Sequence, residues 1–150
     1  MDEFERQILR IMQTDTRKTT EEIGFELGLS ATSVQRKIKK LRQSGAIQKE
    51  IAVLNGAEIG GFVTVIVEVV MVRGGAAIID SFRNKIEKCP EVQQCYYVAG
   101  DNDFVLIITA ENMMKYEEVT RELFLNDSTV HKFQTNVVMK EVKVGLDIPI

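Results

Sequence analysis

Apolar residues recur at helical spacing through the first third of the chain. One stripe comprises Phe4, Ile8, Ile11 and Met12. Residues separated by four, seven and eight positions share one face of a helix, so this stripe predicts a first helix. Asp2 offers an N-cap, and the polar cluster at residues 14–16 marks the end of the helix.

Two further helices follow in the same segment. The second is capped by Thr19 or Thr20, carries Ile23 and Leu27 on one face, and stops at Gly28. The third begins after Ser30 and ends at residues 44–45, and its inward stripe is Val34, Ile38 and Leu41. Two short helices joined by a tight turn over residues 28–30 predict a helix-turn-helix.

The pattern changes near residue 60, where strands and helices begin to alternate. Strands are expected at residues 62–72, 92–99, 104–110 and 129–139, and helices at residues 78–89 and 113–123. Pro90 ends the first of these helices, and Asn112 caps the second. The order is βαββαβ, which predicts a ferredoxin-like sandwich.

Both faces of the strand at residues 62–72 are apolar. Its odd-numbered residues are uniformly hydrophobic, while the even positions mix Phe62, Ile66 and Val70 with polar residues. Helices of the same chain can cover one face, and we expect a partner subunit to cover the other. The predicted fold class is therefore α+β, with a winged-type helix-turn-helix domain at residues 1–46. A connecting strand and linker at residues 47–61 leads to a βαββαβ domain at residues 62–150.

Composition removes several classes of protein. The chain has 150 residues, of which 27% are charged and 45% hydrophobic, as in ordinary globular proteins. No apolar run reaches the roughly 18 residues that a membrane helix needs, and the acidic N-terminal residues do not form a signal peptide. With only Cys89 and Cys95, a disulfide scaffold is excluded, so we expect a cytoplasmic protein.

Charge is distributed unevenly, and the cationic part coincides with the third helix. The net charge is −3, yet six basic residues and no acid lie between Leu27 and Lys49. A solvated helix face is the plain interpretation of a basic run, and helical hairpins in many proteins share this spacing. Here, however, the outer face combines hydroxyl, amide and guanidinium groups, which are the groups that contact bases and phosphates. The candidate DNA-binding residues are Ser30, Thr32, Ser33, Gln35, Arg36, Lys37, Lys39, Lys40, Arg42 and Gln43.

Many short matches along the whole chain resemble the leucine-responsive regulatory protein/AsnC family of prokaryotic transcription regulators. They include residues 22–30, 44–47, 90–92 and 98–100, together with Asp103, Phe104 and Thr135. Departures are Glu5 in place of aspartate, Gly24 in place of alanine, and residues 48–50 in place of a Gly-Tyr sequence. Gly24 is expected to loosen the second helix by up to about 1 kcal/mol.

The resemblance implies a homo-oligomeric, DNA-binding transcription regulator. Family members dimerise through the βαββαβ domains and often form octamers. Many sense an amino acid at the contact between dimers, where the loop between the second and third strands of the domain supplies much of the pocket. No cofactor or metal is expected.

The corresponding loop has suitable chemistry for a zwitterion. Gly100 allows backbone N–H groups to approach a carboxylate, Asp101 or Asp103 can hold an ammonium group, and Asn102 can donate and accept. Tyr97 and Thr135 are further candidate effector contacts. The alternatives are an ordinary hairpin turn for the loop and ordinary strand residues for the other two.

Two other functions remain as alternatives. An architectural protein would bind DNA without an effector and without strong sequence preference. A small enzyme could use Asp101 and Asp103, with Cys95 or His131, but these residues lack metal-ligand or catalytic spacing. We therefore predict a sequence-specific transcription regulator rather than an enzyme.

Overall fold

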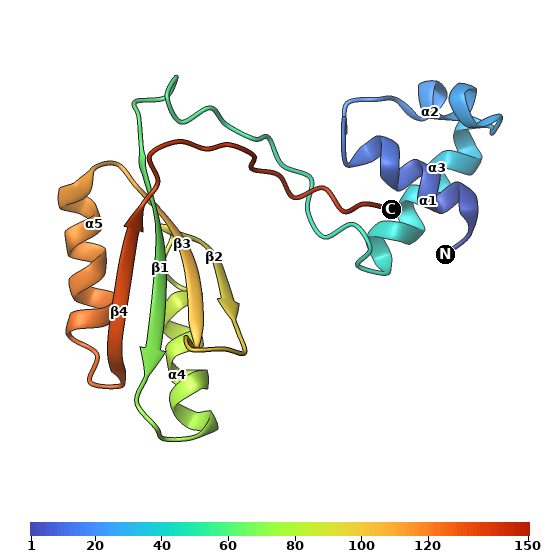
Figure 1. The fold of residues 1–150 in the computed structure, drawn as a ribbon. Coiled ribbons are helices and arrows are strands. Elements are labelled where there is room, and N and C mark those ends of the chain that lie inside the picture. Colours follow the sequence, from blue (N-terminus) through green and yellow to red (C-terminus); the bar gives the residue numbers. More distant parts are fainter. The chain divides into compact units, whose positions relative to one another are not determined.

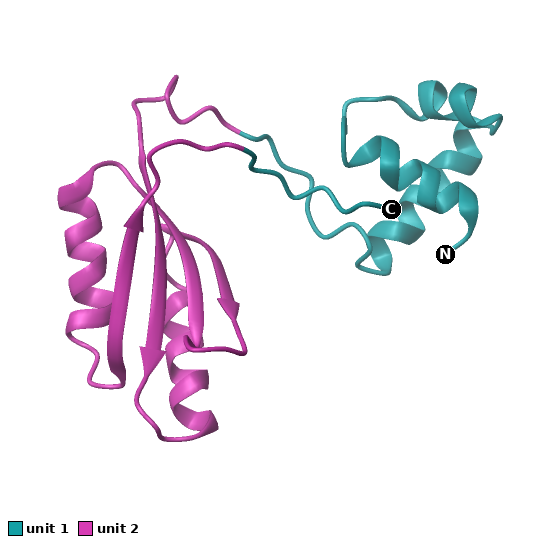
Figure 2. Ribbon diagram, in the orientation of Figure 1, with its two compact units in different colours: residues 1–53, 143–150 teal, residues 54–142 magenta.

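A computed structural model describes all 150 residues as two compact units (Figure 2). The first unit comprises residues 1–53 together with residues 143–150, and the second comprises residues 54–142. The chain therefore leaves the first unit once and returns to it near its end. No helix in the structure is both long and apolar enough to cross a membrane.

Three capped helices form the first unit: α1 (Glu3–Met12), α2 (Thr20–Leu27) and α3 (Ala31–Gln43) (Figure 1). Asp2 and Thr19 each build a capping box, and Ser30 accepts a hydrogen bond from the Ser33 backbone. Gly28 ends α2 with φ at 66°, a left-handed conformation that glycine adopts without strain. The predicted caps and the helix-turn-helix are thus confirmed.

The core of this unit is the predicted set of inward stripes. The buried residues are Ile8, Met12, Ile23, Val34, Ile38 and Leu41. One expectation was wrong, because Phe4 is 42% exposed. Phe4 lies in the first turn of α1, at the margin of the core, where the Lys37 ammonium sits 5.9 Å from the centre of its ring.

The second unit has the predicted βαββαβ order. Strands β1 (Val63–Met71), β2 (Val92–Tyr97), β3 (Phe104–Ala110) and β4 (Val130–Val137) form one antiparallel sheet in the order β2-β3-β1-β4. Helix α4 (Ala76–Ile86) joins β1 to β2. Helix α5 (Met113–Thr120) continues into the π-helical turn η1 (Arg121–Leu125) before β4. The α+β fold class is therefore confirmed.

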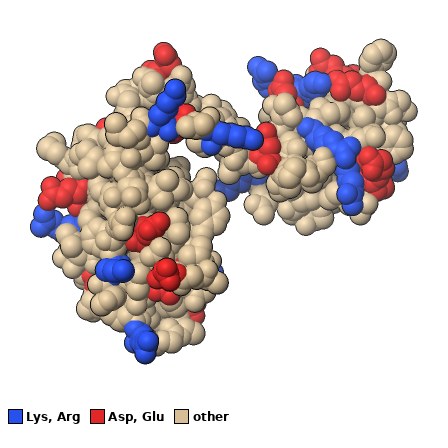
Figure 3. Space-filling view, viewed as in Figure 1, with Lys and Arg blue, Asp and Glu red and all other residues tan.

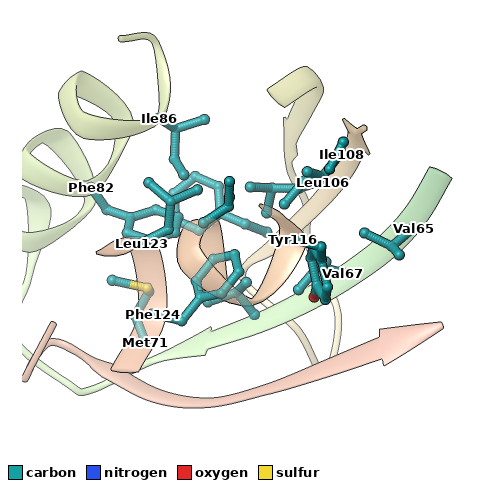
Figure 4. Close-up of a cluster of buried hydrophobic side chains, with 14 residues drawn as sticks. Val65, Val67, Met71, Phe82, Ile86, Leu106, Ile108, Tyr116, Leu123 and Phe124 are labelled. Atoms are coloured by element: carbon teal, nitrogen blue, oxygen red, sulfur yellow. The ribbon is translucent and has the colours of Figure 1, made fainter. Parts of the chain in front are cut away.

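One face of this sheet packs against the helices. Val65, Val67 and Val69 of β1 belong to one buried cluster with residues of the helices. Figure 4 shows Val65 and Val67 in this cluster together with Phe82 of α4 and Phe124 of η1. The opposite face of β1 and β3 is only half-buried, because no element of the chain covers it. Its apolar residues are Ile66, Val70, Val105 and Ile107.

The predicted connecting strand within residues 47–61 does not form. No strand forms between the end of α3 and the start of β1, so the helix-turn-helix has no wing in the single chain, and residues 55–60 include a turn instead. The backbone of residues 48–54 has no hydrogen-bond partner in the chain, and a strand cannot form without one. Alternation of apolar residues indicated the extended conformation correctly but not the missing neighbour.

Smaller corrections concern the ends of elements. Met113 and Met139 lie within the ranges expected for a helix and a strand, yet both side chains are exposed, since Met113 starts α5 and Met139 follows the end of β4. The π-helical turn brings Phe124 into the core beside Leu123, which an α-helical period does not predict. His131 is exposed because the register of β4 shifts there, so that Val130 rather than His131 lies opposite Met71.

Candidate nucleic-acid interface and effector loop

The outer face of α3 is polar, exposed and free of acidic side chains. Val34, Ile38 and Leu41 turn inward, which leaves the opposite side of the helix to solvent. The exposed candidates on this helix are Thr32, Gln35, Arg36, Lys39, Lys40, Arg42 and Gln43, with Ser33 and Lys37 partly buried. Ser30 itself caps the helix N-terminus, so its hydroxyl already accepts a backbone hydrogen bond.

Three of the predicted basic contacts have carboxylate partners within the same unit. Lys37 bonds to Asp2, and Lys40 lies 2.7 Å from Glu5. Arg42 forms two hydrogen bonds of 2.9 Å to Glu50. Sequence analysis missed these carboxylates. The Asp2–Glu5 capping-box spacing was visible, but the contact of α1 with Lys37 and Lys40 spans 35 residues.

Arg36 and Lys39 differ from these paired cations. Neither has a carboxylate within 4.0 Å, and the same is true of Lys49 just beyond the helix. An unpaired surface cation can bind a phosphate or a base edge without first breaking an ion pair. Lysine and arginine side chains accordingly form a band across this unit, with acidic groups beside it (Figure 3).

The contact between Lys40 and Glu5 also has a structural role. Glu5 is only 2% exposed, and its carboxylate accepts hydrogen bonds from Lys40 and from the Asp2 backbone N–H at 2.8 Å. The Lys40 ammonium, followed by the backbone of Asp2, holds the pKa of the Glu5 carboxyl below its usual range. The ion pair between Lys40 and Glu5 therefore connects α3 to α1, independently of any contact that Lys40 makes with DNA.

The loop between β2 and β3 contains one anchored and one free carboxylate. Asp103 accepts a hydrogen bond from the Met71 backbone at 2.7 Å, and its own backbone N–H donates to Val69. Asp101 is exposed and makes no hydrogen bond or ion pair, and nothing lies within 4 Å of the position a Gly100 Cβ would occupy. Of the two candidates, Asp101 is thus the carboxylate available to an ammonium group.

The other two effector candidates lie on opposite edges of the sheet. Tyr97 is on β2, 63% exposed, and its ring lies 5.1 Å from that of Phe104. Thr135 is on β4, where its hydroxyl and that of Tyr116 are 2.5 Å apart. Because β3 and β1 lie between the two strands, one chain does not assemble Tyr97 and Thr135 into a single site.

The residues that an enzyme could use for catalysis lie apart from one another, and Asp103 is already engaged in a hydrogen bond to the backbone. Burial is the main cause that raises the pKa of the Cys89 and Cys95 thiols, which disfavours the reactive thiolate. His131 is exposed on β4, at the opposite edge of the sheet from Cys95. The Asp103 carboxylate accepts a hydrogen bond from the Met71 backbone N–H at the end of β1. These positions form no nucleophile–base pair.

Comparison with known proteins covers both units. Residues 1–42 match the AsnC-type helix-turn-helix domain, and residues 64–147 match the Lrp/AsnC ligand binding domain. An uncharacterized HTH-type transcriptional regulator of Sinorhizobium fredii is 39% identical over 150 residues, covering 100% of this chain and 89% of that protein. The leucine-responsive regulatory protein of Escherichia coli K12 is 32% identical over 143 residues, covering 95% and 87%.

Solved structures show the same fold. An AsnC family transcriptional regulator from Agrobacterium tumefaciens superposes with a TM-score of 0.90 at 25% identity, covering 99% of this chain and 97% of the other. A transcriptional regulator of Neisseria meningitidis, solved as a complex with L-methionine, gives a TM-score of 0.90 at 23% identity, with 99% and 96% coverage.

Proposed function

The chain belongs to the Lrp/AsnC family of transcription regulators, and we propose that it reads a specific DNA site as a dimer whose assembly responds to an amino acid. It is a regulator and not an enzyme. Within it, we assign residues 1–46 to DNA binding, residues 62–150 to oligomerisation and effector binding, and residues 47–61 to the connection. A DNA target places its site of action in the cytoplasm.

The outer face of α3 carries the DNA-binding proposal. Its single supporting observation is that Arg36 and Lys39 project from an exposed helix face without any carboxylate partner. Arg36 and Gln43 can form bidentate contacts to base edges, whereas Lys39 neutralises phosphate. The remaining contacts are proposed for Ser30, Thr32, Ser33, Gln35, Lys37, Lys40 and Arg42. For Lys37, Lys40 and Arg42, contact with phosphate competes with the carboxylates described above.

Dimerisation is proposed through the uncovered face of the sheet. Ile66 and Val70 of β1 and Ile107 of β3 lie on that face, half-exposed, and a second copy can bury them. Two helix-turn-helix units then enter successive major grooves about 34 Å apart, so the site is a pseudo-palindrome. Association of dimers into octamers is the proposed higher assembly.

The proposed effector is an amino acid held at the loop of Gly100, Asp101 and Asn102. Asp101 is free to hold an ammonium group, and the space beside Gly100 admits a carboxylate to backbone N–H groups. The methionine-bound Neisseria regulator, which shares the fold, supports this ligand class. Since Asp103 is anchored and Tyr97 and Thr135 lie apart, the proposed pocket is completed by another chain.

Selection of bound sequences from a random DNA pool, with and without the twenty amino acids, tests this function. We expect an enriched palindrome with half-sites about one helical turn apart, and a changed recovery when the effector is present. Salt-sensitive binding without enrichment would instead indicate the architectural protein. Absence of any DNA binding would refute the proposal.

Paired substitutions test the orientation of α3. Arg36→Ala should relax base preference at one position of each half-site, at a cost of about 1–3 kcal/mol for the preferred site. Arg6→Ala is the matched control, because Arg6 is an exposed, unpaired arginine on α1. Its replacement removes the same charge as the replacement of Arg36. Unchanged affinity and preference in Arg36→Ala would show that another face of α3 meets the DNA.

A further inference from the structure

The carboxylates that pair with the cations of α3 are not held equally. Asp2 and Glu5 form the capping box of α1, in which each side chain accepts the backbone N–H of the other residue at 2.8 Å. Glu5 is in addition almost fully buried. Moving either carboxylate away would leave a backbone N–H at the start of α1 without its partner. The acids beside Lys37 and Lys40 are therefore fixed parts of the helix start.

Glu50, in contrast, is held by Arg42 alone. Its two carboxylate oxygens accept hydrogen bonds from Nε and Nη2 of Arg42, both at 2.9 Å. The carboxylate makes no other hydrogen bond or ion pair, and residues 48–54 make no backbone hydrogen bond. No other hydrogen bond breaks when this carboxylate leaves Arg42, so Glu50 is the displaceable partner among the three.

Arg42 lies on a flank of α3 that carries other candidate DNA contacts. It follows Lys39 by three residues and Gln35 by seven, and these spacings place the three side chains on one side of the helix. Lys39 has no carboxylate partner, and the Arg42 side chain is 53% exposed. Without Glu50, Arg42 therefore continues the row of free cations that Lys39 begins.

Arg42 and Glu50 also line a surface hollow of about 290 Å³. The core residues Ile23 and Ile38 and the polar side chain of Gln35 contribute to its lining. This volume is several times the roughly 30 Å³ that a water molecule occupies. A group larger than a carboxylate can thus reach the Arg42 guanidinium from this side.

The guanidinium of Arg42 binds an anion even in the free chain. Hydrogen bonding between the two groups lowers the pKa of the Glu50 carboxyl and raises the pKa of Arg42, so both are charged at neutral pH. A carboxylate presents two oxygens to the fork of an arginine, and a phosphodiester presents its two non-bridging oxygens in the same way. The Glu50 carboxylate therefore resembles a DNA backbone phosphate in charge and in geometry.

We propose that Arg42 is a subsite for a DNA backbone phosphate, and that Glu50 occupies this subsite until DNA displaces it. The inference rests on the function proposed above, and it identifies which of the paired cations exchanges its carboxylate for DNA. Only chains in which Arg42 is free can make this contact. The apparent dissociation constant for DNA is therefore the intrinsic constant divided by the fraction of such chains.

The exchange couples DNA binding to the connection between the two units. The bonds from Arg42 to Glu50 are the only side-chain hydrogen bonds between residues 48–61 and the three helices. DNA binding therefore releases the connection from α3, and any arrangement that holds residues 48–54 away from α3 favours DNA binding to the same extent. Glu50 belongs to residues 48–50, where this sequence departs from the Gly-Tyr of the family pattern, so the contact comes from this chain's own residues.

Binding of a fluorescently labelled DNA duplex of random sequence, measured by anisotropy in about 0.1 M salt, tests the exchange. Glu50→Gln should lower the dissociation constant about two- to fivefold, which is the range that exposed ion pairs contribute. Glu58→Gln is the matched control, because Glu58 is exposed, unpaired and in the same connection. It removes the same charge and should change the dissociation constant by less than about 1.5-fold.

A double-mutant cycle separates displacement from general repulsion. Arg42→Ala should weaken binding, and in that background Glu50→Gln should give no gain, because the subsite is absent. A gain of the same size in both backgrounds would mean that Glu50 acts only through its charge, and it would overturn the inference. Equal dissociation constants for Glu50→Gln and the unmodified chain would overturn it as well.

Circular dichroism checks the fold of each variant in the cycle. If Arg42→Ala unfolds, Arg42→Lys takes its place, since lysine keeps the charge but lacks the two-pronged contact, and the gain from Glu50→Gln should then shrink. If the unmodified chain binds the duplex but the cycle shows no coupling, DNA binding stands and the exchange at Arg42 is wrong. If no variant binds DNA, both proposals are wrong.

Discussion

Replacement of Gly24 by alanine has two opposite effects on stability, and the size of each is known approximately. Gly24 lies in the interior of α2, where alanine is favoured by about 1 kcal/mol through helix propensity. In this chain, however, an added Cβ would lie 2.6 Å from the Leu29 carbonyl oxygen and 3.5 Å from the Ala31 nitrogen. The turn between α2 and α3 therefore passes directly over this glycine, and the expectation of a merely loosened helix needs correction.

The steric effect should be the larger one. The Leu29 oxygen is backbone, so relief requires the turn to move, and the Leu29 N–H donates to the Gly24 carbonyl at 2.9 Å. Overpacking of this kind costs about 1–3 kcal/mol, and weakening the hydrogen bond adds about 1 kcal/mol. After subtracting the propensity gain, we expect Gly24→Ala to destabilise the first unit by about 1–3 kcal/mol.

Thermal unfolding of the full chain measures this difference. For a unit of this size, 1 kcal/mol corresponds to about 4–8 °C, so the melting temperature of the first unit should fall by at least about 4 °C. Phe25→Ala is the matched control, since Phe25 is the next residue, 91% exposed, and its replacement should change stability by about 0.5 kcal/mol or less. A melting temperature that rises in Gly24→Ala would refute the steric argument.

Three further outcomes follow from the site. The Glu5 pKa lies below its ordinary value of 4.5, so its ionised form stabilises the first unit above that pH and the contribution is lost as the pH falls through the lowered pKa. Lys40→Ala removes the main cause, so acid unfolding followed by circular dichroism should begin at a higher pH, whereas Lys39→Ala should leave it unchanged. Lys39→Ala should instead reduce the salt dependence of DNA binding, with the slope of log K against log [salt] falling by about 2 per dimer, and an unchanged slope would exclude a phosphate contact. Asp103→Ala should destabilise the second unit by about 1–3 kcal/mol in urea titration because it leaves the Met71 N–H unpaired, whereas Asp101→Ala should leave stability intact and abolish the effector response. The reverse result would exchange the roles of the two carboxylates.

Local chemistry made much of the fold predictable. Asp2, Thr19 and Ser30 cap their helices with bonds that span three residues, and such signals are present in the sequence itself. The alternation in β1 likewise identified the buried face, since side-chain direction along a strand has period two.

Contacts between distant residues were not predictable in the same way. The basic residues of α3 were all candidate DNA contacts in the sequence, but Lys37 and Lys40 meet acids of α1 that only the folded unit brings near. The effector residues illustrate the same limit, because the sheet order places Tyr97 and Thr135 on opposite edges. Residues 47–61 have strand periodicity, yet pairing depends on a neighbour that the single chain does not supply.

The return of residues 143–150, the tail, to the first unit has a consequence for synthesis of the protein. Residues 1–53 leave the ribosome about 90 residues before the tail does, an interval of roughly 5–20 s at ordinary elongation rates. The three helices have their own buried core and can fold within that interval. The bonds from Gln13 to Ile148 form only after β4 has been made. Docking of the tail therefore occurs only after residues 143–150 have been made, when the DNA-binding helices have already had time to fold.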